Sequence, residues 1–222
     1  MIYLFNSEEK ITADIKEVYR YSGVKSVSID KSTEAFVLEI KEELEKAASF
    51  KLCYTKNEFN EKELSFGIGE VKSTALLKNL KGCQSVYIFA ATAGVEVDRI
   101  INRYSTLSPA RAVIAQAVGA ALVEGWCDLF CESIAKEEKL NGMFLRPRFS
   151  PGYGDFDINY QKNIINTLDA TKYTGVTLTD SLMMVPTKSV TAVMGVSEIN
   201  NGCALSGCEM CDKENCQFRR NL

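Results

Sequence analysis

Apolar residues recur at helical spacing along several stretches of the chain. Residues 7–21 are predicted to form a helix whose apolar residues lie on one face, and Gly23 would end it. A second helix is expected to begin at Asp30 or Ser32 and to carry an apolar stripe opposite a charged, solvent-facing side. Further helices are predicted over residues 73–80, 95–104, 108–139 and 158–174.

Other stretches follow the two-residue period of a strand. Residues 50–55 alternate between apolar and polar side chains, whereas residues 86–91 form a continuous apolar run that is typical of a central strand. Strands are also expected over residues 176–179 and 189–196. The order of elements does not repeat as strand–helix–strand, so we predict an α+β fold with a largely antiparallel sheet and helices around it, over residues 1–200.

The helix expected over residues 108–139 is rich in small side chains. Its interior Gly119 and Gly125 would each cost about 1 kcal/mol relative to alanine, so close packing against the sheet or another helix should compensate. The same helix carries Cys127 and Cys131 four residues apart on one face. Two thiols can begin a metal site, but buried structural thiols are the preferred interpretation.

Composition narrows the possible functions. The 222 residues are 46% apolar and 25% charged, with a formal net charge of −3 and no histidine. With this net charge we expect no basic surface that could bind nucleic acid. No apolar run approaches the ~20 residues that a membrane-spanning helix needs. Histidine-based catalysis and histidine metal ligation are excluded. A cytoplasmic location is expected, because the first residues do not resemble a signal peptide.

Residues 146–157 combine residue types that build a stiff, ligand-accessible bend. Prolines fix the backbone, Gly152 and Gly154 permit positive φ, and Arg148 offers a planar five-donor fork that suits a carboxylate. Asp155 or Asp157 could cap the helix that follows. The bend is therefore either a small-molecule site or a conformationally demanding connection.

The bend and its neighbours resemble one known family. The motif from Arg148 through Tyr153, the segments 171–175 and 178–190, and the upstream segment 89–98 are similar to the reactivation domain of cobalamin-dependent methionine synthase. The similarity runs from about residue 86 to residue 196. It implies a twisted antiparallel sheet flanked by helices.

The resemblance also implies a function and a site. Such domains bind S-adenosylmethionine and dock over a cobalamin-carrying domain, where an electron donor such as flavodoxin or ferredoxin reduces the oxidised cobalt before methyl transfer. The residues that match the family's binding loop are Arg148, Ser150, Pro151, Gly152 and Tyr153. In this interpretation Arg148 holds the ligand's carboxylate, and Tyr153 lies between ligand and corrin in the catalytic step.

The sequence departs from the family in two places. Residues 154–157 follow the Pro-Gly-Tyr motif where the large enzymes have a segment with proline and cysteine, and the early acidic residue of the family has no clear counterpart. The chain also shows no corrinoid, folate or homocysteine domain. It is therefore expected to act in trans on a cobalamin-binding methionine synthase or another corrinoid protein.

Residues 201–222 differ in character from the rest. Four cysteines lie within 14 residues: Cys203, Cys208, Cys211 and Cys216. Four thiolates at this density could hold zinc or an iron–sulfur cluster, and we prefer this interpretation to the alternative of a disordered tail with reducible thiols. Besides the reactivation role, two hypotheses therefore remain: a non-catalytic docking module for a corrinoid protein, and a metal-dependent redox protein that uses this tail.

Overall fold

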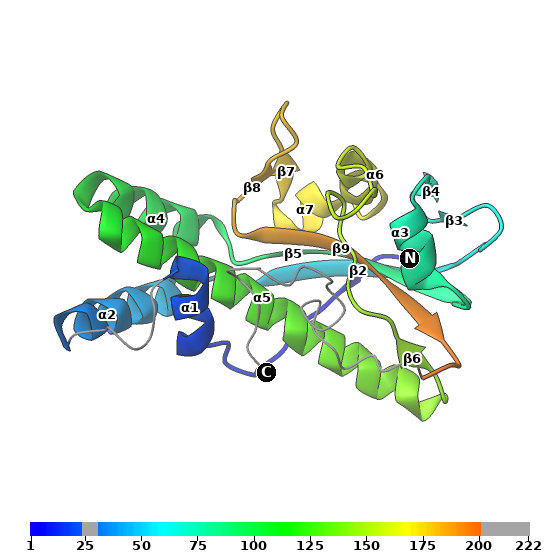
Figure 1. Cartoon of the computed structure of the whole chain (residues 1–222), viewed down its shortest axis with the longest axis horizontal. Coiled ribbons are helices and arrows are strands. Elements are labelled where there is room, and N and C mark those ends of the chain that lie inside the picture. The colour runs from blue at the N-terminus through cyan, green and yellow to red at the C-terminus, as the bar shows by residue number, and fades with distance from the viewer. Residues whose placement is uncertain (24–30, 201–222) are drawn as a thin grey trace.

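A five-stranded antiparallel sheet forms the centre of the molecule (Figure 1). The computed structural model describes residues 1–23 and 31–200. In sheet order the strands are β1 (Tyr3–Leu4), β2 (Lys51–Glu58), β5 (Ser85–Thr92), β9 (Ser189–Ser197) and β6 (Phe144–Leu145). Every pairing in this sheet is antiparallel, so the predicted α+β class is confirmed.

Helices cover both faces of the sheet. Four helices lie on one face: α1 (Ile15–Ser22), α2 (Lys31–Ala47), α4 (Val95–Leu107) and α5 (Pro109–Leu140). The other face is covered by α3 (Thr74–Leu80), α6 (Tyr160–Thr167) and α7 (Ala170–Thr174). Two small hairpins complete the described chain: β3 (Ser65–Phe66) with β4 (Gly69–Glu70), and β7 (Thr177–Leu178) with β8 (Met184–Val185).

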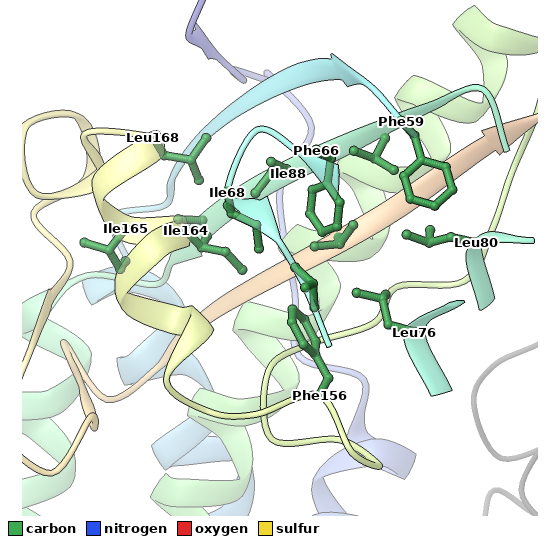
Figure 2. Packing of buried hydrophobic residues seen from close by; sticks show 14 of the residues in the cluster. Phe59, Phe66, Ile68, Leu76, Leu80, Ile88, Phe156, Ile164, Ile165 and Leu168 are labelled. Atoms are coloured by element: carbon green, nitrogen blue, oxygen red, sulfur yellow. The ribbon is translucent and has the colours of Figure 1, made fainter. Parts of the chain in front are cut away.

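Strand β5 is apolar throughout because both of its faces are buried. Ile88 and Ala90 point into the core under α3, α6 and α7, which Figure 2 shows from close by. Phe89 and Ala91 point the opposite way, and the Phe89 ring lies 5.2 Å from that of Phe130 on α5. A strand in this position has no solvent-facing side, which explains the continuous apolar run.

Helix α5 crosses the whole width of the sheet and ends near β6 (Figure 1). Among the described residues it is the one helix long and apolar enough to cross a bilayer, and 61% of its most apolar stretch is buried inside the fold. A side chain at Gly119 would lie 3.0 Å from Lys188 Cγ and 3.1 Å from Ile101 Cδ1. The predicted close packing at this glycine is therefore confirmed.

The C-terminal part of α5 is also held by a polar contact. Glu138 is buried, accepts a hydrogen bond from the Tyr87 hydroxyl, and pairs with Lys56 Nζ at 2.6 Å. Both partners stand on neighbouring strands of the sheet. A buried carboxylate is stable only with such partners, so this contact fixes the position of the helix over the sheet.

One predicted helix start is corrected by the structure. The first helix begins at Ile15 rather than at residue 7, because the Asp14 carboxylate accepts from the backbone N–H of Lys16 at 2.9 Å and caps α1. The second begins at Lys31 in the described chain, and Asp30 lies outside the described residues. Gly23 ends α1 in the left-handed conformation, as predicted.

The bend over residues 146–157 is tied to the sheet at its start. Phe149 exchanges two backbone hydrogen bonds of 2.9 Å with Val193, so this part of the chain continues the sheet edge beside β9. Gly152 and Gly154 adopt φ values of +93° and +56°, which only glycine adopts without strain. The predicted need for glycine at both positions is therefore confirmed.

Asp155 caps a different helix from the one predicted. Its carboxylate accepts from the Ser73 hydroxyl at 2.6 Å and from the N–H groups of Thr74 and Ala75 at 2.8 and 3.0 Å. It therefore ties the bend to the start of α3, about 80 residues earlier in sequence. Asp157 instead accepts from Asn159 N at 2.8 Å, just before α6. Sequence spacing alone could not indicate the long-range partner.

Two glycine substitutions should have opposite effects on stability. A Cβ at Gly195 would overlap Cys83 Sγ and lie 2.8 Å from Leu80 Cδ2, so Gly195→Ala should cost about 1–3 kcal/mol of unfolding free energy. At Gly125, within α5, the nearest atoms are Ile11 Cγ2 at 3.5 Å and Thr12 O at 4.0 Å, so Gly125→Ala should gain about 0.5–1 kcal/mol. Urea denaturation measures both, and equal stability of the two variants would contradict this packing.

Asp155→Asn should lower the thermal midpoint, whereas Asp157→Asn should change it less. Hydrogen bonds from Ser73, Thr74 and Ala75 hold the pKa of Asp155 well below its usual value. A carboxyl with a lowered folded-state pKa stabilises the fold above its unfolded pKa of about 3.9, and this contribution is lost as pH falls through the folded-state pKa. The difference between wild type and Asp155→Asn should thus be constant near neutral pH and shrink below about pH 4. A difference that grows on acidification would disprove the cap.

Candidate functional site

Arg148 turns back from the bend onto helix α5. Its Nη2 lies 2.6 Å from Asp128 Oδ1 and 3.0 Å from Glu124 Oε2, so one guanidinium nitrogen joins two carboxylates. Its Nη1 is buried and has no hydrogen-bond partner within the described ranges 1–23 and 31–200. The Arg148 guanidinium, which was predicted to bind a ligand's carboxylate, is therefore already paired with two carboxylates of the protein itself.

The surroundings of Arg148 favour its charged form. Burial works against the charge, but the neighbouring Cys127 and Cys131 and the carboxylates of Glu124 and Asp128 together raise the pKa of Arg148 above its usual value. Burial in turn raises the pKa of the Cys127 thiol well above the ordinary range. The site thus contains a permanent cation between an acidic pair and two cysteines.

A surface pocket of about 320 Å³ opens beside this acidic pair, between α5 and the N-terminal segment. Its lining residues are Thr12, Asp14, Glu17, Tyr21, Ala121, Glu124, Gly125 and Asp128. Gly125 has no side chain at the wall where Ile11 and Thr12 approach the helix. The pocket wall is therefore formed by two segments that lie more than 100 residues apart in sequence.

Four of the residues around the pocket are acidic. Asp14 caps α1, and Glu17 pairs with Arg20 within the same helix. The other two, Glu124 and Asp128, are the partners of Arg148. The predicted site residues did not include Asp14 or Glu17. Within the helix predicted over residues 7–21, both look like ordinary surface acids.

None of the five predicted binding-loop residues lines this pocket. Arg148 joins it through Glu124 and Asp128, whereas Pro151 is buried beneath the bend and Ser150 is half-buried, with its carbonyl accepting from Tyr153 N at 3.2 Å. Tyr153 itself is 67% exposed. Beside it, Gly152 is exposed at the turn. The bend thus presents two different faces, a guanidinium toward α5 and a ring toward solvent.

The turn after β5 joins a central strand to the N-terminus of α4. In the structure its space is largely taken by other parts of the chain: a Cβ at Gly94 would lie 2.9 Å from the Ser49 carbonyl oxygen. Asp98, in the first turn of α4, accepts from Thr187 N at 2.6 Å and from the Thr187 hydroxyl at 2.8 Å. These contacts indicate that the turn packs α4 against the chain before β9.

The metal prediction falls on residues outside the described part of the chain. Cys203, Cys208, Cys211 and Cys216 all lie in residues 201–222, so the zinc or iron–sulfur hypothesis stays a prediction. Among residues 1–23 and 31–200, no three His, Cys, Asp or Glu residues gather as a metal site. Cys127 is completely buried in the core, as the structural interpretation of this thiol expects.

Comparisons with known proteins agree with this architecture. A model of the family described as "Vitamin B12 dependent methionine synthase, activation domain" matches residues 77–202. Among solved structures, the crystal structure of the MetH reactivation domain bound to AdoHcy matches with a TM-score of 0.56 and 14% identity, over 88% of this chain and 78% of that one. A search of curated proteins found no match. The family match covers more than half of the sequence, including the whole of α5 and the bend, and the chain therefore belongs to the family of vitamin B12-dependent methionine synthase activation domains.

Proposed function

We propose that this protein reactivates a cobalamin-dependent methionine synthase, or another corrinoid protein, by presenting S-adenosylmethionine to a cobalamin that a separate polypeptide holds. The observation that carries the proposal is the convergence of Arg148, from the family's binding loop, with a pocket lined by Asp14, Glu17, Glu124 and Asp128. Family membership gives the role, and the pocket gives a place for the ligand.

The charge of the pocket suits this ligand. S-adenosylmethionine carries a sulfonium and an ammonium group, and the four acidic residues around the pocket offer carboxylates to both. Tyr21 adds a ring at the rim. Attraction between opposite charges at this partly enclosed surface is stronger than in bulk water, which favours the methyl donor over its neutral-sulfur product.

The ligand's amino-acid end can enter the ion pair that Arg148 already makes. Its carboxylate would accept from the Arg148 guanidinium, while its ammonium would donate to Glu124 or Asp128. This exchange keeps every charge paired, because a zwitterion supplies one group of each sign. It explains how an arginine that is occupied in the ligand-free protein could still serve as the binding fork.

Tyr153 would contact the corrinoid protein rather than the ligand in the pocket. Its exposed ring stands at the tip of the bend, where a docked corrin could lie. An electron donor such as flavodoxin or ferredoxin reduces cobalt(II) to cobalt(I), the cobalt attacks the sulfonium methyl group, and the carbon–sulfur bond breaks to leave S-adenosylhomocysteine. AdoHcy is the ligand bound in the similar crystal structure. Since the sequence contains no histidine, any histidine that ligates cobalt comes from the partner.

A second candidate function is favoured by the paired state of Arg148. A guanidinium that is held by two carboxylates could serve structure alone, and the protein would then be a docking module that binds the corrinoid protein without S-adenosylmethionine. The two candidates differ in one property that can be measured on the purified protein, which is affinity for the methyl donor.

Calorimetric titration with S-adenosylmethionine separates these functions. Wild type should bind, and Arg148→Ala and Glu124→Gln should each weaken binding at least about tenfold, because a charge-assisted hydrogen bond contributes about 1.5–3 kcal/mol. Arg111→Ala is the matched control, since Arg111 pairs with the exposed carboxylate of Glu39 at 3.3 Å and does not line the pocket.

The same titration can also favour the docking function. If wild type gives no binding heat, yet forms the same complex with a cobalamin-loaded methionine synthase fragment whether or not S-adenosylmethionine is present, the docking function holds and the proposed one fails. Unchanged affinity in Arg148→Ala would remove Arg148 from the ligand site.

A further inference from the structure

Helix α5 contains two glycines, Gly119 and Gly125, and packing explains only the first. A glycine in a helix interior costs about 1 kcal/mol relative to alanine, so each of the two calls for a physical reason. A Cβ at Gly119 would lie 3.0 Å from Lys188 Cγ and 3.1 Å from Ile101 Cδ1, which is tighter than an ordinary contact. Close packing therefore accounts for the glycine at position 119.

Neither backbone conformation nor packing requires glycine at position 125 in the described part of the chain. The residue lies in the interior of a regular helix, a conformation that alanine adopts more readily than glycine does. A Cβ there would meet Ile11 Cγ2 at 3.5 Å and Thr12 O at 4.0 Å, which are ordinary van der Waals distances. Alanine would therefore fit between α5 and the N-terminal segment.

A side chain at position 125 would stand at the wall of the acidic pocket. Gly125 lines this pocket together with Ala121, which lies about one helical turn earlier. The carboxylate-bearing residues Glu124 and Asp128 line it beside them. The surface that α5 offers between the two acids thus consists of small residues, and glycine lets a ligand approach the helix backbone closely.

The ion pairs of the proposed site bring a particular part of the ligand to this surface. The amino-acid end of S-adenosylmethionine would bind among Arg148, Glu124 and Asp128. Gly125 directly follows Glu124 and precedes Asp128 by a rise of about 4.5 Å along the helix axis. Since only a short methylene chain joins the sulfonium to the amino-acid carbon, the sulfonium would lie within reach of residue 125.

We propose that Gly125 is a specificity-determining residue, because its missing side chain leaves the clearance that a sulfonium and its substituents need beside α5. This inference rests on the proposed function and adds a residue to its ligand site. It also accounts for a glycine that lowers the stability of the helix. Ligand binding and stability make opposite demands at this position, and that opposition can be measured.

The test measures stability in urea and S-adenosylmethionine affinity by calorimetry on the same full-length variants. Gly125→Ala should raise stability and yet weaken binding at least about fivefold, because the added methyl group overpacks the occupied pocket. Gly125→Leu, with a longer side chain of good helix propensity, should weaken binding more than about 100-fold. Ser133→Ala is the matched control. Ser133 is exposed on α5 and does not line the pocket, so this variant should gain stability at unchanged affinity.

The outcomes separate this inference from the proposed function. If wild type does not bind S-adenosylmethionine, the proposed function fails and the role of Gly125 fails with it. If wild type binds and Gly125→Ala binds equally well, the inference alone is overturned. A Gly125→Ala variant less stable than wild type would show that packing requires the glycine, which also overturns it. So would a Gly125→Leu variant that binds S-adenosylmethionine normally but no longer forms a complex with a cobalamin-loaded methionine synthase fragment, since the pocket would then receive a side chain of the partner.

Discussion

The packing of α5 against the sheet is the constraint on which the site depends. Phe130 packs against Phe89 of the central strand, and Glu138 is hydrogen-bonded to Tyr87 on the same strand. With the helix fixed at these points, Glu124 and Asp128 are directed toward Arg148 and toward the N-terminal segment. A shift of α5 by one residue would rotate these acids by about 100° and separate the bend from the pocket.

The bend is held as firmly as the helix that it meets. Phe149 pairs with β9, Asp155 caps α3, and Phe156 fills the core between α3 and α6 (Figure 2). These three contacts leave the glycine turn and Tyr153 at the surface. The rigid frame therefore positions Arg148 on one side and an exposed ring on the other, as the proposed ligand site and docking surface require.

Much of this architecture could be predicted from periodicity and turn chemistry. The apolar run at residues 86–91, the small-residue helix and the positive φ of Gly152 and Gly154 follow from local physics, and each is confirmed. The pocket could not be predicted in this way. In a helix predicted over residues 7–21, Asp14 and Glu17 look like ordinary surface acids, and only the tertiary fold brings them to Glu124. The cap by Asp155 and the internal pairing of Arg148 likewise depend on partners that are distant in sequence.

The central claim is that this chain brings a methyl group to cobalt on another polypeptide. The most direct test incubates a cobalamin-loaded methionine synthase fragment in the cobalt(II) state with a reductant and S-adenosylmethionine carrying a trideuterated methyl group. Mass spectrometry then measures labelled methylcobalamin with and without this protein. The account predicts label on cobalamin only when the wild-type chain is present, and far less with Arg148→Ala. Equal labelling in the absence of the chain, or none in its presence while the two proteins form a complex, would contradict it.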